Sequence, residues 1–132
     1  MPRGYTQSET FVHYMDYHFV WTPKYRKKLI VDNVEKRLKS LQKEKCKQLG
    51  IEIISLETMP DHVHIFLKAT PVLAPNRIVA ALKGYTSRVL RQEFAHLKSG
   101  RPTLWSRSYF VSTHSHVSNE TKKYIEEQQT PY

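Results

Sequence analysis

The chain has 132 residues, 39% of them hydrophobic and 11% aromatic, which suffices for one domain with its own core. Lysine and arginine number 21 against 12 acidic residues, and the formal net charge of +9 favours a polyanionic partner, nucleic acid before membrane. Solubility alone is the other explanation of this charge. The single cysteine, Cys46, excludes a disulfide framework and a thiolate metal site.

We expect the whole chain, 1–132, to form a single domain in which residues 1–9 are a loose, polar lead. The sequence shows neither a signal peptide nor a run of about 18 apolar residues that would span a bilayer. The expected protein is therefore cytoplasmic and nucleoid-associated, with no membrane partner.

Apolar periodicity, capping residues and turn residues predict the elements of the fold. The first is a strand over 11–21, which is rich in aromatic and β-branched residues and ends at Pro23. The others are a helix over 32–49, strands over 51–56 and 62–68, a helix over 76–97, a strand over 104–111 and a helix over 118–129. Two helices that cross over and pack on an antiparallel sheet form the split βαβ arrangement of ferredoxin-like and RNA-recognition-motif folds. We therefore expect an α+β protein with a further helix at its C-terminal end.

A basic stretch follows the first predicted strand. In residues 24–28, Tyr25 is surrounded by lysine and arginine only. Such a mixture suits contact with a phosphate backbone and stacking of an unpaired base. A solvated basic loop explains the composition equally well.

A His-x-His pair lies in the predicted strand over 62–68. Because side chains of a strand repeat every two residues, His62 and His64 project from one face, while Val63 and Ile65 point the other way into a core. Two neutral imidazoles on a rigid backbone are a natural pair of metal ligands. For a bare His-x-His, however, packing or hydrogen bonding beside the sheet is the commoner role.

Two acidic residues come before this pair. Asp61 could orient an imidazole, although a turn role after Pro60 is the commoner one for this residue type. Glu57, on the preceding strand, is an auxiliary candidate with less to support it.

The predicted C-terminal helix carries Tyr124 and Gln128, which are four residues apart and therefore share one face. A phenol can attack phosphorus and hold the product as a phosphotyrosine, which conserves the bond energy for a later rejoining step. A carboxamide oxygen could complete a hard-metal site with two imidazoles. By spacing alone, a packing tyrosine and a solvated glutamine are the more common interpretations.

Several motifs follow one another along nearly the whole chain. They are VWTPKYRKK at 20–28, MPDHVHIFLK at 59–68, LKGYTSRVLR at 82–91, LWSRSYFVST at 104–113 and KKYIEEQ at 122–128. Over about residues 11–129, this series resembles the HUH single-tyrosine transposases of small bacterial and archaeal insertion sequences, the IS200-like superfamily.

The resemblance implies an enzyme that cuts and rejoins single-stranded DNA at the ends of a mobile element. By this resemblance, His62, His64 and Gln128 match the metal ligands and Tyr124 the nucleophile, with Mg²⁺ or Mn²⁺ as the expected ion. The tyrosine would take the 5′ phosphate while a 3′ hydroxyl leaves. A 3′ hydroxyl of another end or of the target would later attack that linkage and restore the DNA.

The resemblance also implies the partners of the chain. Family members form homodimers through sheet edges, with the tyrosine acting in its own subunit or in the partner's, and they recognise DNA hairpins near element ends. Basic residues that we expect to contact the DNA backbone are Lys24, Arg26, Lys27, Lys83, Arg88 and Arg107.

One segment departs from the family pattern. Where the family usually has small residues and glycine before the tyrosine helix, this chain carries a second His-x-His pair, His114 and His116. We interpret it as a polar linker in a loop, stiffer than a glycine-containing one, and not as a ligand set.

Two other functions compete with the transposase. One is a non-catalytic binder of single-stranded nucleic acid that stacks bases on Tyr14, Tyr17, Trp21 and Tyr25 of an RNA-recognition-like sheet. The other is a replication or plasmid-transfer nickase, which the small single-domain length disfavours.

Overall fold

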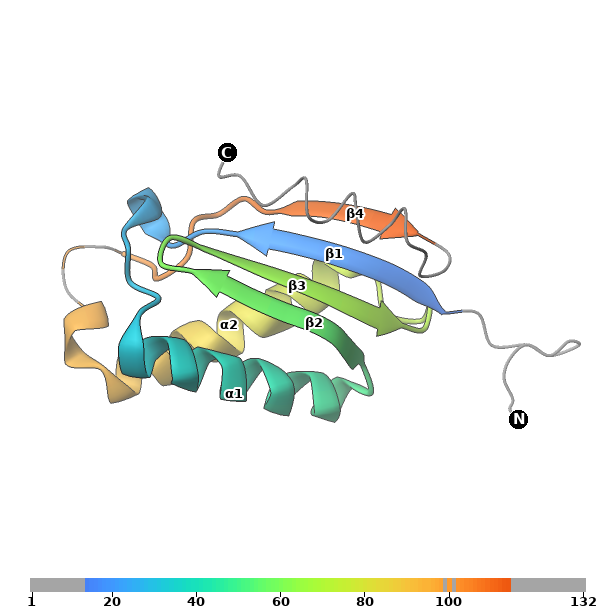
Figure 1. The fold of residues 1–132 in the computed structure, drawn as a ribbon, viewed down its shortest axis with the longest axis horizontal. Helices are drawn as coiled ribbons and strands as arrows, with labels where there is room; N and C mark the ends of the chain where they lie inside the picture. The colour runs from blue at the N-terminus through green and yellow to red at the C-terminus, as the bar shows by residue number, and fades with distance from the viewer. Residues whose placement is uncertain (1–13, 99, 101, 115–132) are drawn as a thin grey trace, which may run out of the picture.

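The computed structural model describes residues 14–98, 100 and 102–114, and all structural statements refer to these. Four antiparallel strands form one sheet in the order β2-β3-β1-β4, and two long helices cover one of its faces (Figure 1). The elements are β1 Met15–Trp21, η1 Lys24–Arg26, α1 Asp32–Leu49, β2 Glu52–Met59, β3 His62–Ala69, α2 Pro75–Glu93, η2 Ala95–Leu97 and β4 Phe110–His114. The expected α+β fold with a split βαβ topology is confirmed. The C-terminal helix expected over 118–129 lies outside the described residues, as do residues 1–9.

The central strands β1 and β3 separate two kinds of residue onto two faces. Phe19 pairs with Ile65 and Trp21 with Val63, and all four belong to the core cluster that packs under the helices. Alternation along each strand therefore turns the intervening residues toward the opposite face. That second face, which we call the histidine face, carries His18 and Val20 of β1 and His62, His64 and Phe66 of β3.

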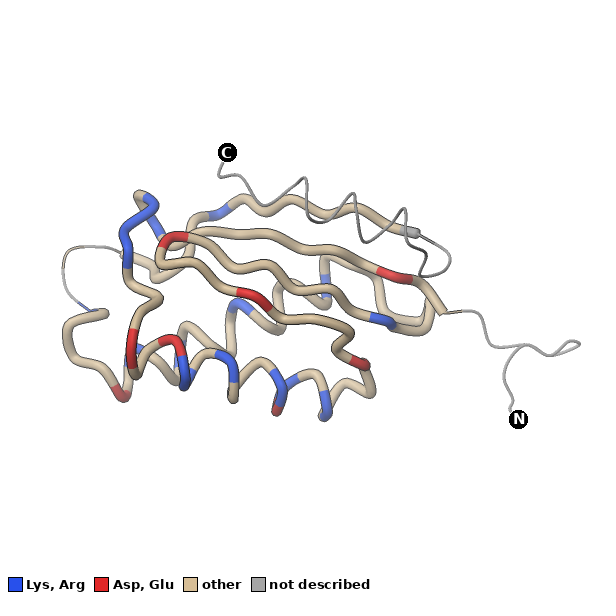
Figure 2. The backbone as a smooth tube through the Cα atoms, viewed as in Figure 1, with Lys and Arg blue, Asp and Glu red and all other residues tan. Residues whose placement is uncertain are grey.

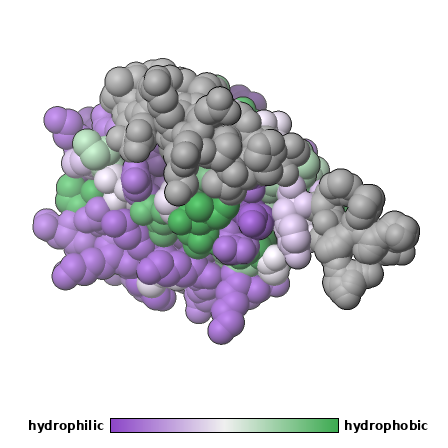
Figure 3. All heavy atoms as spheres, turned by 45° about the vertical axis from the view of Figure 1, so that its right-hand side comes forward, coloured by the Kyte–Doolittle hydropathy of each residue, from purple (hydrophilic) through white to green (hydrophobic). Residues whose placement is uncertain are grey.

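The first helix has the boundaries that the sequence predicts. α1 ends at Leu49, and Gly50 follows in the left-handed conformation, with φ 72°, as the residue that closes the helix. Only glycine adopts this conformation without a steric cost. The buried side of α1 includes Leu38 and Leu41, while its outward side is hydrophilic and forms the lower surface in Figure 3. The same helix is joined to α2 by Arg37, whose guanidinium makes two hydrogen bonds to the Glu93 carboxylate, at 2.8 and 2.9 Å.

The second helix is shorter than predicted. α2 starts at Pro75, but it ends at Glu93 and not at 97, because Phe94 is extended and a 3-10 turn follows over Ala95–Leu97. The turn buries Leu97 completely. Burying a leucine side chain contributes about 1.5–3 kcal/mol, which exceeds the net value of about 1 kcal/mol for a helical hydrogen bond given up.

The last strand lies later in the chain than predicted. The prediction was 104–111, whereas β4 covers Phe110–His114. Leu104 and Trp105 instead enter the core, where the Trp105 ring contacts Trp21 edge-on and its Nε1 donates a hydrogen bond to Thr86 Oγ1 at 3.0 Å. The backbone here forms an isolated antiparallel bridge between Trp105 and Pro23, just past the end of β1, and the continuous ladder with β1 starts at Phe110.

Two smaller boundaries also differ. β2 extends to Met59, beyond the predicted end at 56, and contains an irregularity between Ile53 and Ser55. His114 is the last residue of β4, paired with Asp16, and therefore does not belong to a loop as the sequence suggested. His116 lies outside the described residues. Among the residues that the structure describes, no helix combines the length and apolarity needed to cross a bilayer.

Candidate metal site and basic surface

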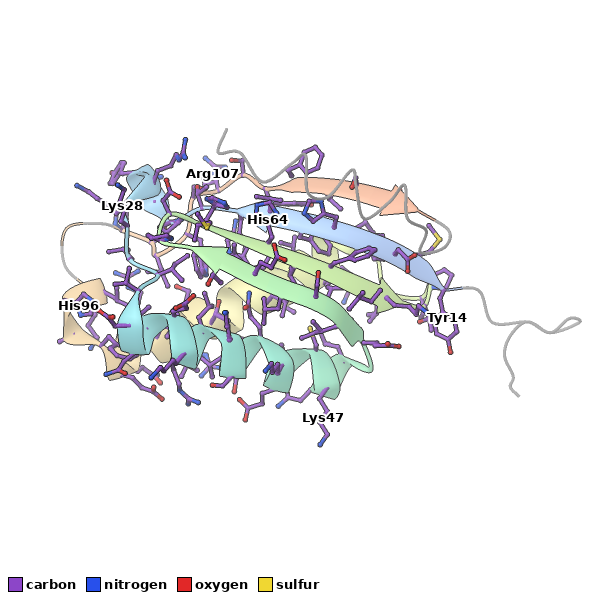
Figure 4. The ribbon with its side chains drawn as sticks, in the orientation of Figure 1. Tyr14, Lys28, Lys47, His64, His96 and Arg107 are labelled. Atoms are coloured by element: carbon purple, nitrogen blue, oxygen red, sulfur yellow. The ribbon has the colours of Figure 1, made fainter. Side chains whose placement is uncertain are left out.

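The two motif histidines lie side by side at the start of β3. Their ring centroids are 5.0 Å apart with planes inclined by 65°, and both project from the histidine face. Figure 4 shows His64 on the sheet where β1 and β3 run next to each other. The prediction that the pair shares one face of a strand is confirmed, because the ladder between β2 and β3 is regular from His62 to His64.

Both imidazoles are buried but open onto a pocket. His62 is 2% exposed and His64 is 4% exposed. They line a pocket of about 340 Å³, and its other walls are Lys39, Leu56, Glu57, Thr58 and Met59. The pair therefore faces a space large enough for an ion with its ligands and not the packed core.

One ring nitrogen of His62 makes a hydrogen bond and the other makes none to the described residues. Its Nδ1 lies 2.8 Å from Oδ1 of Asp61, and Arg26 Nη2 donates to the other carboxylate oxygen at 3.1 Å. Partial burial alone would raise the pKa of Asp61, but the hydrogen bonds from His62 and Arg26 outweigh it and hold that pKa below its ordinary value. An ionised carboxylate only accepts, so the imidazole donates from Nδ1, and Nε2 is the nitrogen that could bind an ion.

His64 is held in a comparable way by a residue that the sequence did not single out. His64 Nδ1 lies 3.1 Å from Nε2 of His18, which is fully buried on β1. Burial, together with the neighbouring imidazoles of His18 and His62, lowers the pKa of His64 to about 4. The ring is therefore neutral at pH 7, as coordination of a metal requires. The only signal in the sequence was a polar residue, His18, between the aromatic residues Tyr17 and Phe19 of the strand.

This donor set fits a divalent metal ion. The Nε2 atoms of His62 and His64 are both buried and make no hydrogen bond within the described part of the chain. A buried polar atom without a partner is costly, and a metal ion at the pocket would satisfy both. The described residues contain no group of three or more His, Cys, Asp and Glu that could hold an ion, so further ligands would have to come from elsewhere. Gln128 and Tyr124, the other predicted site residues, lie outside the described residues.

Part of the predicted DNA-contacting set gathers at one end of the sheet. Lys24 and Arg26 lie in η1, directly followed by Lys27, and Figure 2 shows this turn as a concentration of positive charge. The backbone of Lys24 donates to the carbonyl of Leu104 at 2.8 Å, which brings the segment of the exposed Arg107 to the same end (Figure 4). These residues surround the entry to β3, where the histidine pair begins.

Two predicted DNA contacts lie elsewhere. Lys83 of α2 is half-buried and donates to the carbonyl of Ser106 at 2.6 Å, and burial lowers its pKa. It therefore serves the loop that leads into β4. Arg88 is on the helical side, 5.4 Å from the ring of Tyr85, so the structure does not bring it to the histidine face.

Of the four aromatic residues proposed for stacking, two are exposed and two are buried in the core. Tyr25 is 64% exposed and adopts a left-handed conformation with φ 61°. Tyr14 is exposed as well, but at the other end of β1 (Figure 4). Tyr17 and Trp21 are core residues under the helices and cannot stack on a base, which corrects the prediction of an aromatic platform along β1.

A fold of this topology, with paired histidines on the sheet face opposite its helices, is shared with a transposase family. The model of the family "Transposase IS200 like" matches residues 11–128. The ISDra2 transposase TnpA of Deinococcus radiodurans is 36% identical over 131 residues, which cover 97% of this chain and 94% of that protein. The chain therefore belongs to the IS200-like transposase family, and the resemblance seen in its motifs is confirmed.

Other relatives agree with this assignment. The transposase for insertion sequence element IS200 of Salmonella typhimurium is 28% identical over 114 residues, covering 85% of this chain and 75% of that protein. A crystal structure of a Deinococcus radiodurans protein described as a candidate transposase superposes with a TM-score of 0.76 at 37% identity, over 99% of this chain and 100% of that one. A REP-associated tyrosine transposase bound to a REP hairpin shares the fold, with a TM-score of 0.60 at 11% identity over 96% of this chain and 68% of that one.

Proposed function

We propose that this transposase cleaves and rejoins single-stranded DNA at insertion-sequence ends through a 5′-phosphotyrosine on Tyr124. The observation that carries the proposal is the pair of buried Nε2 atoms of His62 and His64 at one pocket, which make no hydrogen bond to any described residue, in a chain of this family. In this proposal His62, His64 and Gln128 hold Mg²⁺ or Mn²⁺. Such an ion neutralises charge on the scissile phosphate when it is bound.

The covalent step is an exchange of phosphoesters. The phenolic oxygen of Tyr124 forms a bond to phosphorus while the bond from phosphorus to the 3′ oxygen breaks, and the 3′ oxygen leaves as a hydroxyl after taking a proton. Because one ester replaces another, the bond energy is kept. In the second step a 3′ hydroxyl attacks the phosphotyrosine, and Tyr124 regains its proton. No nucleotide cofactor is needed for either step.

The DNA ligand of this chain is, in our proposal, a hairpin with unpaired flanking bases. A hairpin is what the REP-associated relative binds. In this chain, Lys24, Lys27 and Arg107 supply positive charge at the entry to β3, and Tyr25 offers an exposed ring beside them. Phosphate contacts give affinity and register, whereas a stacked unpaired base gives a preference for single strands.

We also propose that the protein acts as a homodimer. β2 and β4 are the two edges of the described sheet, and an edge strand can pair with a second chain. Whether Tyr124 would act in its own subunit or in the partner's is decided by a mixture of two inactive variants, Tyr124→Phe and His64→Ala. Cleavage restored in the mixed dimer requires the tyrosine of one chain to serve the histidines of the other.

The test of the proposed function is formation of a covalent protein–DNA adduct. A labelled oligonucleotide with the hairpin and flanking single strand of an element end is incubated with the protein and Mg²⁺, then analysed under denaturing conditions. The wild type should give a shifted band, Tyr124→Phe should bind the oligonucleotide without a covalent band, and His64→Ala should neither cleave nor form the adduct. A covalent band from Tyr124→Phe would rule out the nucleophile, and no band from the wild type would favour a non-catalytic binder, for which the exposed Tyr25 is the supporting observation.

A further inference from the structure

His18 and His64 are diagonal neighbours across the two central strands. In the β1–β3 ladder, His18 pairs with Phe66 and Val20 with His64, so both rings are on the histidine face. Their centroids are 5.3 Å apart, their planes are inclined by 25°, and Nε2 of His18 lies 3.1 Å from Nδ1 of His64. His18 is fully buried, which keeps bulk water from competing for this hydrogen bond.

A hydrogen bond between two neutral imidazoles can form in two ways, and only one of them suits a metal ligand. If His64 donates from Nδ1, its Nε2 carries a free lone pair. If His18 donates from Nε2 instead, the proton of His64 must be on its own Nε2. That nitrogen is buried at the pocket, and in the second arrangement its lone pair would be unavailable to a metal ion.

We infer that His18 is a positioning residue, which accepts a hydrogen bond from Nδ1 of His64 and thereby fixes the tautomer whose Nε2 can bind a metal ion. In this arrangement His18 carries its own proton on Nδ1. The inference rests on the proposed metal site, but the tautomer itself is a property of the protein without metal. Ligand histidines generally donate their second ring nitrogen to such a partner, which orients the ring.

The two ligand histidines would then be oriented by groups of different charge. His62 donates to the Asp61 carboxylate, whereas His64 donates to a neutral ring. A carboxylate makes a ligand more basic and lowers the net charge of the site, and a neutral acceptor does neither. His18 therefore fixes the orientation of His64 without adding a second negative charge near an ion that must attract phosphate oxygens.

The tautomer of His64 provides a direct test that needs neither metal nor activity. In protein labelled with ¹⁵N-histidine and freed of metal, long-range proton–nitrogen correlation spectra distinguish protonated from unprotonated ring nitrogens, and loss of the signals in His64→Gln assigns them. We expect His64 to be protonated on Nδ1 and His18 also on Nδ1. A proton on Nε2 of His64 overturns the inference.

Metal affinity provides the second test. Binding of Mn²⁺, followed by its electron paramagnetic resonance signal, should weaken about 10–100-fold in His18→Leu, which has no acceptor. In His18→Gln, whose side-chain oxygen can take the place of Nε2, binding should return to within a few-fold of the wild type. Equal Mn²⁺ affinity of His18→Leu and the wild type, or equal weakening in both variants, contradicts a role through hydrogen-bond acceptance.

The two measurements separate a failure of this inference from a failure of the proposed function. Absence of Mn²⁺ binding by the wild type, with His62→Ala as the reference for a disrupted site, overturns the metal site. The spectra of the metal-free protein decide the role of His18 in either case, because they report where the His64 proton is and not whether an ion binds.

Discussion

At the scale of single residues, the candidate site depends on where each imidazole keeps its proton. In His62 and in His64, Nδ1 makes a hydrogen bond to another side chain, whereas Nε2 makes none to the described residues. Both residues line the same pocket. The partner of His62 is Asp61, which Arg26 holds from η1. The commoner interpretation of Asp61, as a turn residue only, is therefore incomplete, because its carboxylate bridges the basic turn and a candidate ligand.

This bridge leads to a prediction for Asp61. Asp61→Ala should reduce the single-turnover rate of Mg²⁺-dependent DNA cleavage by about 10–100-fold, because His62 loses the acceptor that orients it. Asp61→Asn should lose less, since the amide oxygen still accepts from Nδ1. Hairpin binding at low salt should be retained by both variants. Wild-type cleavage by Asp61→Ala would contradict the positioning role.

At the scale of elements, the turn η1 has an unusual backbone. Tyr25 and Arg26 both have positive φ, at 61° and 51°, although neither is glycine. A non-glycine residue in the left-handed region costs roughly 1 kcal/mol, and such strain persists most often where function requires it. Here the conformation exposes the Tyr25 ring while Arg26 reaches back to Asp61.

Tyr25 is therefore expected to stack on an unpaired base. Tyr25→Ala should weaken binding of a hairpin with a single-stranded flank by about 1–3 kcal/mol, whereas Tyr25→Trp should preserve it. Tyr14→Ala is the matched control, since Tyr14 is also exposed but lies at the far end of β1 (Figure 4). Fluorescence anisotropy with a labelled oligonucleotide measures the difference. Equal losses in Tyr25→Ala and Tyr14→Ala would mean that the turn makes no specific stacking contact.

At the scale of the whole molecule, the two faces of the sheet have different roles. One face packs in the hydrophobic core and the other carries the candidate site. One face is covered by α1 and α2 and contains the hydrophobic core. The histidine face and the basic end next to it carry the candidate site. Figure 2 shows lysines and arginines in the turn η1, next to the candidate site, and also along α1, so the net charge of +9 does not by itself locate a DNA-binding surface.

The placement of charge predicts a position-dependent salt effect. Replacing Lys24 or Arg107 by glutamine should weaken hairpin binding and reduce the slope of log affinity against log salt by roughly one for each phosphate that the protein no longer neutralises. Lys47→Gln removes the same charge from the opposite end of the molecule, near the end of α1 (Figure 4), and should leave the slope unchanged. If all three variants shift the slope equally, net charge and not its location drives binding.

For the described residues, the types and order of the main strands and helices followed from the sequence because the periods of apolar residues are local properties. The predicted boundaries of α2 and β4 are wrong because tertiary contacts outweigh the local preference of the chain there. α2 ends early because Leu97 is drawn into the core, and β4 starts late because Trp105 packs against Trp21 and hydrogen-bonds Thr86. Tyr17 and Trp21 were proposed as a stacking surface because the sequence does not show which face of β1 the helices cover.

The sequence by itself determined that His62 and His64 share a face, because side chains of a strand alternate and the two residues are adjacent in that alternation. Only the tertiary structure decided what holds each ring. The hydrogen bond between His18 and His64 joins residues 46 positions apart, and the one between Arg26 and Asp61 spans 35. Contacts over such separations depend on which strands pair and in which register, and no local pattern encodes that.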